Sequence, residues 1–126
     1  MVERMIPYKE LKALCSKKLI EAGILAEDAE LTADVLVHAN LRGADSHGVM
    51  RTEHYVKWIR AGGINPVPEI KIKDTGPSSA IVDGDDGLGH VISVKAMERA
   101  IDLAKKMALE WLRLLTAVIA VLCPIS

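Results

Sequence analysis

The chain has 126 residues, of which 50% are apolar and 26% are charged, a composition typical of a globular protein and not of a disordered or fibrous one. Its 16 basic and 17 acidic residues give a net charge of -1, and no run of Lys and Arg forms the basic patch that nucleic-acid binding requires. A chain of this length can form one core, with little apolar surface to spare. We therefore expect a small globular protein that does not bind nucleic acid.

The cysteines and the start of the chain indicate the compartment. Cys15 and Cys123 lack the spacing of a metal site. Residues 1–11 include Glu3, Lys9 and Glu10 and no long apolar run, unlike a secretory signal peptide. We therefore expect reduced thiols and a cytoplasmic protein.

Hydrophobic periodicity predicts two helices at the start of the chain. Apolar residues recur at helical spacing between Pro7, which suits a first helical turn, and Gly23, which ends the pattern. A second helix is expected over residues 26–41, where acidic residues in the first turn complement the helix dipole. Its apolar face is expected to consist of Ala29, Ala33, Leu36 and Leu41.

A third helix and a hairpin are expected next. Residues 49–61 keep helical spacing until two consecutive glycines end the pattern. Residues 69–73 and 79–83 resemble two short strands joined by the turn-forming sequence Asp-Thr-Gly-Pro. The glycine-rich residues 83–89 have neither the element order of a phosphate loop nor the ligand spacing of a calcium loop, so a turn is expected there.

The composition changes within the last part of the chain. A fourth helix is expected over residues 91–106, with apolar positions at Val94, Met97, Ile101 and Ala104. Beyond Lys106, residues 109–125 contain no Gly, Asp or Lys, and residues 114–125 carry no charge. A helix of this uncharged stretch rises only about 18 Å against roughly 30 Å of hydrocarbon, so no membrane span is expected.

Polar side chains concentrate between the second and third expected helices. If Ser46 and His47 lie in the turn that enters the third helix, Arg51 and Tyr55 follow at steps of four on a face near His47. An imidazole can transfer a proton at neutral pH, a guanidinium can bind a carboxylate through two parallel hydrogen bonds, and a phenol can donate a further hydrogen bond. These groups are what a site for a 2-hydroxy acid or 2-keto acid needs.

Spacing alone leaves a structural interpretation open for each of these residues. Ser46 can cap the helix, Arg51 can be a solvated charge and Tyr55 can belong to the core. His38 and His54 have no obvious partner and are expected at the surface or in packing. From spacing alone, the structural interpretation is the better one.

Residues 41–49, with the sequence Leu-Arg-Gly-Ala-Asp-Ser-His-Gly-Val, together with Arg51 and Tyr55, resemble the malate/L-lactate dehydrogenase family. That family includes ureidoglycolate, sulfolactate and diketogulonate-acting members. Later glycine and proline positions also fall where the family has them, so the resemblance covers about residues 9–106. It implies an α/β fold in which a helical N-terminal region leads into a mixed sheet, a non-Rossmann nicotinamide-dependent dehydrogenase fold that is truncated in this chain.

The resemblance also implies an activity. Members of the family move a hydride between NAD or NADP and the CH-OH group of a small 2-hydroxy acid of the malate, lactate or ureidoglycolate type. His47 would be the catalytic proton-transfer group, and Ser46, Arg51 and Tyr55 would bind the substrate carboxylate. No metal is implied. The full-length protein would be a homodimer that binds a hydroxy acid or keto acid.

Three further details follow from comparison with the family. It assigns no cofactor-binding residue to this chain, because most of the nicotinamide site of the family lies beyond it. Similarity in residues 51–55 and 75–79 slightly favours the ureidoglycolate subgroup. His90 departs from the glutamine that the family often has after its glycine loop.

Residues 107–126 depart from the family altogether. In the family, the helix that ends near Lys106 leads into a Gly-rich strand and an Asn-Ser-x-His-x-Gly segment, whose histidine is a second catalytic group. When the third base of each codon is read with the first two of the next, Met107 and Ala108 must encode glycine, and the following codons permit the missing segment. We therefore expect residues 1–106 to be the N-terminal part of the dehydrogenase domain, followed by an out-of-frame tail, in an inactive chain.

A second hypothesis needs no lost base. In it, the chain is a noncatalytic binding or oligomerisation module that uses a C-terminal apolar helix. Its apolar face would consist of Leu112, Leu115, Ile119 and Leu122. Deleting residues 107–126 distinguishes the two hypotheses, because a docking helix is needed for assembly and a scrambled tail is not.

Overall fold

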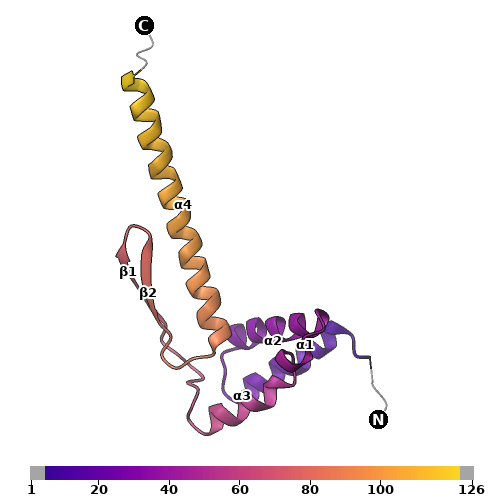
Figure 1. Cartoon of the computed structure of the whole chain (residues 1–126). Helices are drawn as coiled ribbons and strands as arrows, with labels where there is room; N and C mark the ends of the chain where they lie inside the picture. Colours follow the sequence, from indigo (N-terminus) through magenta and orange to yellow (C-terminus); the bar gives the residue numbers. More distant parts are fainter. Residues whose placement is uncertain (1–4, 123–126) are drawn as a thin grey trace.

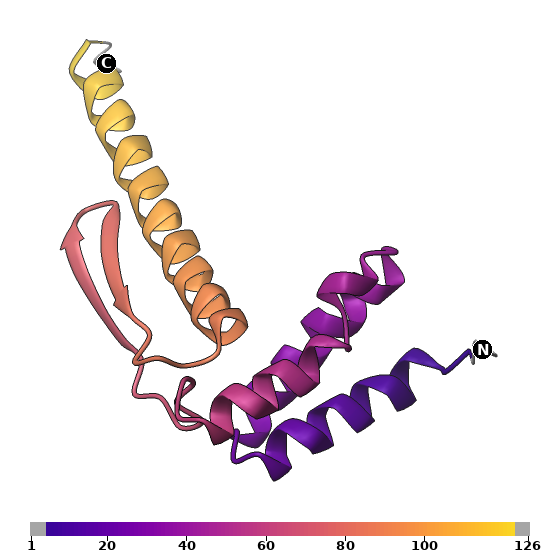
Figure 2. The same ribbon diagram turned by 60° about the horizontal axis from the view of Figure 1, so that its bottom comes forward.

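A computed structural model describes the backbone of residues 5–122 and the side chains of residues 5–113. Three α-helices and a short 3-10 turn are followed by a β-hairpin and a long final helix (Figure 1). Helices α1, α2 and α3 gather at one end, and we call them the helical base. The hairpin and α4 extend away from it as an arm, as the rotated view also shows (Figure 2).

The first two helices form where the sequence predicts them. Helix α1, Tyr8–Glu21, begins after Pro7, and the chain leaves it through Gly23, whose φ of 107° is a left-handed conformation that favours glycine. Helix α2, Ala26–Leu41, has the expected bounds, with Glu27 and Asp28 in its first turn. The two helices pack side by side in the base.

The core of the base lies between these helices. Ala29, Ala33 and Leu36 of α2 are fully buried, which confirms most of the predicted apolar face. Leu41 is 66% exposed, so its place on that face was wrong: α2 ends at this residue and the chain turns away from the core. The core is completed by Cys15, Leu19, Ile24, Ile59, Ile64, Leu88 and Val91.

A buried polar contact joins the first and third helices. The Sγ of Cys15 and the Oγ1 of Thr52 lie 3.0 Å apart, and both side chains are buried. Burial raises the pKa of the Cys15 thiol, although the hydrogen bond with Thr52 acts in the opposite direction. Helix α3, Arg51–Arg60, is shorter than the predicted 49–61, because the preceding residues form the 3-10 turn Asp45–His47 and its exit.

The hairpin differs from its prediction in its first strand. Strand β2, Ser79–Asp83, has the expected bounds, but β1 is Lys71–Gly76 and not residues 69–73. The strand continues through Asp74 because a bulge between Asp74 and Gly76 absorbs the extra residue. The described residues contain only this two-stranded antiparallel sheet, so the mixed sheet expected from the resemblance is represented here by a hairpin alone.

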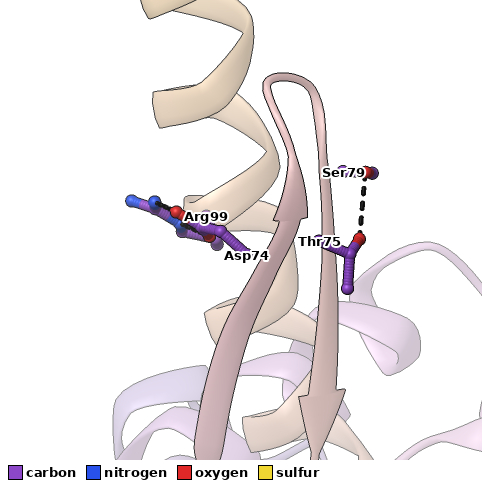
Figure 3. A network of polar contacts seen from close by, with 4 residues as sticks. All are labelled: Asp74, Thr75, Ser79 and Arg99. Carbon is purple, nitrogen blue, oxygen red and sulfur yellow. Dashed lines mark hydrogen bonds and ion pairs between the residues drawn. The ribbon is translucent and has the colours of Figure 1, made fainter.

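An ion pair attaches the hairpin to the last helix. Figure 3 shows Asp74 of β1 beside Arg99, whose Nε donates a 2.9 Å hydrogen bond to Oδ1 while one Nη contacts Oδ2. This hydrogen bonding lowers the pKa of the Asp74 carboxyl and raises that of Arg99. Thr75, the next residue of β1, donates a 3.0 Å hydrogen bond from its Oγ1 to Oγ of Ser79 on β2 (Figure 3). Because a two-stranded hairpin is only marginally stable alone, these contacts hold it in place.

Helix α4, Gly89–Leu122, is longer than the predicted 91–106. It crosses Lys106 and Met107 without a break, because the residues that follow are good helix formers with no glycine or proline. Of its apolar positions, Val91 and Leu103 are buried, whereas Met97 and Ile101 are exposed. Within residues 5–122, no helix is long and apolar enough to cross a membrane.

Candidate functional site

The Asp45–His47 turn is held by the amide of Asn40, at the end of α2. Its Oδ1 accepts a hydrogen bond from the backbone N–H of Val49 at 2.8 Å, and its Nδ2 donates to Asp45 Oδ1 at 2.9 Å. The amide therefore spans the loop and contacts residues on both sides of the turn. Asn40 was not singled out from the sequence, although an amide side chain at a helix end followed by a short loop is a recognisable pattern for such a contact.

The glycine after the turn lies against the same amide. A Cβ at Gly48 would lie 2.1 Å from Asn40 Oδ1, closer than any side chain allows. Gly48 is buried, so the loop cannot move outward without losing this packing. Asn40 and Gly48 together fix the backbone that carries the candidate catalytic residue.

Ser46 contacts two of the other three predicted site residues, His47 and Arg51. Its hydroxyl oxygen lies 3.0 Å from His47 Nδ1, and its backbone carbonyl accepts a 2.8 Å hydrogen bond from Arg51 Nε. All three residues are exposed at the junction of the turn and α3. Helix α3 begins after Met50, with no side-chain cap, so Ser46 does not cap it. We call Ser46, His47 and Arg51 the acid-binding cluster.

This arrangement leaves reactive atoms available. Among the described residues, only Nε of the Arg51 guanidinium is engaged, so its two terminal nitrogens can bind a carboxylate. The contact with Ser46 occupies Nδ1 of His47, which leaves Nε2 to exchange a proton with a ligand. A fixed imidazole and a fixed guanidinium therefore face solvent from one short segment.

Tyr55 lies apart from the hydrogen bonds of the cluster. It sits one turn after Arg51 in α3, is half-buried and packs against the core. Its ring meets His90 edge to face, with 5.5 Å between ring centroids and 80° between planes. The structural interpretation of Tyr55 as a core residue thus holds in part.

The two rings border a hollow of about 520 Å³ where the base meets the arm. The walls of the hollow are formed by Val35, Tyr55, Gly89, His90, Ser93 and Val94. Burial lowers the pKa of His90, and its Nδ1 is buried without a hydrogen-bond partner among the described residues. From the sequence, His90 was identified as a departure from the family pattern, but no structural role was predicted for it.

The other candidate features are structural. His38 and His54 are exposed, and the described part of the chain has no group of three His, Cys, Asp or Glu residues that could hold a metal. The glycine-rich loop forms a turn in which Asp85 Oδ2 accepts hydrogen bonds from Asn65 Nδ2 at 3.0 Å and from the Glu69 N–H at 2.9 Å. This loop joins β2 to α4, and its hydrogen bonds attach it to the segment that leads from α3 to β1.

A solved dehydrogenase contains the same arrangement of elements. The sulfolactate dehydrogenase of Methanocaldococcus jannaschii matches 81% of this chain with a TM-score of 0.77 and 44% sequence identity, and the match covers 30% of that structure. The turn and helices described above therefore belong to the fold of a dehydrogenase.

Sequence comparison shows which family of proteins the chain resembles. The model of the malate/L-lactate dehydrogenase family matches residues 6–115. A malate dehydrogenase of Pyrococcus abyssi is 48% identical over 101 residues, which is 80% of this chain and 28% of the relative. The ureidoglycolate dehydrogenase (NAD+) of Escherichia coli is 42% identical over 101 residues, 80% of this chain and 29% of the relative.

The chain therefore belongs to the malate/L-lactate dehydrogenase family. It spans less than a third of the length of the curated relatives it matches. The family match extends beyond Lys106, the limit of the resemblance in the sequence.

Proposed function

We propose that this chain is the N-terminal part of a dehydrogenase that acts on the CH-OH group of a small 2-hydroxy acid, with NAD or NADP as hydride acceptor. The observation that carries the proposal is the double contact of Ser46, whose hydroxyl meets the His47 imidazole and whose carbonyl holds the Arg51 guanidinium. A proton-transfer group and a carboxylate-binding group are thereby fixed together. Names of relatives add malate, sulfolactate and ureidoglycolate as candidate substrates.

Each residue of the acid-binding cluster has a distinct role in this proposal. Arg51 binds the substrate carboxylate through its terminal nitrogens. His47 Nε2 accepts the hydroxyl proton during oxidation and returns it during reduction. Ser46 positions both groups, a role that its two contacts support better than direct binding of the carboxylate. Tyr55, one turn beyond Arg51, borders the remainder of the substrate.

The described residues do not fit the dinucleotide by themselves. The loop between β2 and α4 is glycine-rich, but it carries Asp83, Asp85 and Asp86, whose negative charges oppose a pyrophosphate. Asp85 is also engaged with Asn65 and Glu69. The proposal therefore assigns the acid-binding half of the reaction to this chain and no cofactor-binding residue.

Binding of small acids tests the proposal without requiring turnover. L-malate, L-lactate and ureidoglycolate would be titrated into the isotope-labelled chain while the side-chain NMR signals of His47 and Arg51 are followed. We expect saturable shifts that Arg51→Gln abolishes and that Arg60→Gln, an exposed arginine at the end of the same helix, leaves unchanged. Absence of any saturable shift, or equal shifts in Arg51→Gln, would falsify the assignment.

We also propose that this chain lacks dehydrogenase activity and that its full-length form is a homodimer. A third proposal is that residues 107–126 are an out-of-frame tail. Support for the out-of-frame tail comes from the codons of Met107 and Ala108, which must encode glycine in the shifted frame. The gene sequence tests it: the codons of Val118 and Ile119 must spell CAT, a histidine codon, across their junction, so the third base of the Val118 codon must be C. Any other bases there refute the tail hypothesis. A purified chain that oxidises malate, lactate or ureidoglycolate with NAD or NADP refutes the proposed inactivity.

One observation favours the second candidate, a binding or oligomerisation module. Leu109 and Trp111, two large apolar side chains near each other on α4, are 62% and 60% exposed and therefore available to pack against a partner. Deletion of residues 107–126 distinguishes the candidates. If the tail is a docking helix, the deletion reduces self-association or solubility in sedimentation experiments; if the tail is scrambled, the deletion improves both.

A further inference from the structure

The hollow beside Tyr55 and His90 lies next to the acid-binding cluster and is not explained by it. Arg51 and Tyr55 are four residues apart in α3, so they lie on the same face about one turn from each other. A small acid whose carboxylate is bound by Arg51 can therefore reach Tyr55 with its other end. The hollow begins at that ring.

The walls of the hollow determine what can enter. Val35 and Val94 supply apolar surface, while Ser93 and Tyr55 supply hydroxyl groups. Besides His90, Tyr55 is the only titratable residue among those lining the hollow, and no Lys or Arg lines it. A group that is apolar, or that is polar but uncharged, fits these walls better than an anion does, because an anion would lose water without gaining a cation.

His90 determines the position of Tyr55 in this wall. Its ring contacts Tyr55 edge to face at 5.5 Å, from the start of α4 to the middle of α3. The buried Nδ1 has no acceptor among the described residues, so a second N–H on the ring would be left unpaired. Burial lowers the pKa of His90, which favours the neutral form of the ring.

We propose that this hollow takes the uncharged end of the 2-hydroxy acid whose carboxylate Arg51 binds, and that His90 is the positioning residue that holds Tyr55 against it. The inference rests on the proposed function and adds a substrate preference. A methyl group, as in lactate, or a ureido group, as in ureidoglycolate, belongs in the hollow. The second carboxylate of malate does not.

The test compares three acids on the full chain at pH 7.5. Because the chain contains only Tyr8 and Tyr55, tyrosine-labelled protein with a Tyr8→Phe variant gives an assigned ring signal for Tyr55. We expect L-lactate and ureidoglycolate to shift this signal and to bind about tenfold more tightly than L-malate. His90→Ala should reduce this preference and change the free Tyr55 signal. His54→Gln, next to Tyr55 but exposed, is the matched control and should change neither.

A second measurement separates positioning from a loss of folding. In the wild-type chain, lowering the pH through the titration of His90 should improve malate binding relative to lactate, because the ring gains a positive charge. His90→Gln keeps a polar side chain but cannot gain that charge, so the ratio should change with pH less than in the wild type and only through the titration of malate itself. Amide spectra of each variant confirm that the fold is intact.

The outcomes for the two proposals differ. If acids shift His47 and Arg51 but malate binds as tightly as lactate, or if the Tyr55 signal is unmoved by every acid, the hollow is not the substrate subsite and the inference fails while the proposed function stands. If no acid shifts His47 or Arg51, the proposed function fails, and the inference fails with it.

Discussion

The backbone carbonyl of Ser46 accepts a 2.8 Å hydrogen bond from Nε of Arg51, so the guanidinium is anchored to the residue whose hydroxyl meets His47. An exposed arginine normally loses considerable side-chain entropy when it binds a ligand. Here part of that entropy is lost on folding, before the ligand arrives. The orientation of the guanidinium relative to the imidazole is set by five residues of local chain and does not depend on distant packing.

Arg51→Lys tests this anchor. Lysine keeps the charge but has neither the Nε donor nor the planar pair of terminal nitrogens. We expect acid binding to weaken by roughly 10- to 100-fold, the effect of losing one or two charge-assisted hydrogen bonds. The free energy of unfolding should change by less than about 0.5 kcal/mol, because Arg51 is exposed. Arg60→Lys is the control, and an equal loss of binding in both variants would show that only charge matters.

Asn40→Ala should disturb the Asp45–His47 turn. The variant loses the hydrogen bonds to Val49 and Asp45 and the packing against Gly48, and we expect the free energy of unfolding to fall by about 1–2 kcal/mol. His38→Ala, an exposed residue of the same helix, should have little effect. Urea unfolding measures both variants. If Asn40→Ala is as stable as the wild type, the amide does not hold the turn.

The sequence predicted the helical base well because its signals are local. The bounds of α2 and β2 follow from periodicity and from flanking turn residues. The end of α4 was not predicted, because residues 107–122 contain no Gly or Pro and the predicted stop depended on a comparison with the family. The bounds of β1 shifted because a bulge between Asp74 and Gly76 extends the strand, and the contact of Asp74 with Arg99, 25 residues away, is one that no local pattern can reveal.

The candidate site was predicted in composition but not in geometry. Ser46, His47 and Arg51 lie close together because they belong to one turn and the helix that follows it, and spacing predicted this proximity, whereas their assignment to a site came only from the resemblance. Tyr55 follows the same spacing, yet its ring partner His90 comes from a helix that begins more than thirty residues later. That contact depends on how the arm meets the base, and periodicity carries no information about it.

Thr32→Val should stabilise the chain. The Thr32 hydroxyl is fully buried and has no hydrogen-bond partner among the described residues, so an apolar group of the same shape removes a desolvated donor and acceptor. We expect the free energy of unfolding to rise by about 1 kcal/mol. Thr52→Val is the matched control and should destabilise, because its hydroxyl contacts Cys15 Sγ. Thermal unfolding of the two variants with shifts of the same sign would contradict this account.

The stability of the chain should fall in mild acid through His90. Burial lowers its pKa in the folded state below the ordinary value of 6.5, so the unfolded chain takes up this proton first as the pH falls. The stabilisation is therefore fully present above pH 6.5 and is lost as the pH falls through the folded-state pKa. His90→Gln should have a flatter profile of melting temperature between about pH 7.5 and 5, whereas His54→Gln, an exposed control, should keep the wild-type slope. The Tyr55 ring signal should titrate over the same interval in the wild type, since its edge-to-face partner gains the charge. A profile for His90→Gln as steep as that of the wild type would assign the acid sensitivity to other groups and leave the imidazole without an energetic role.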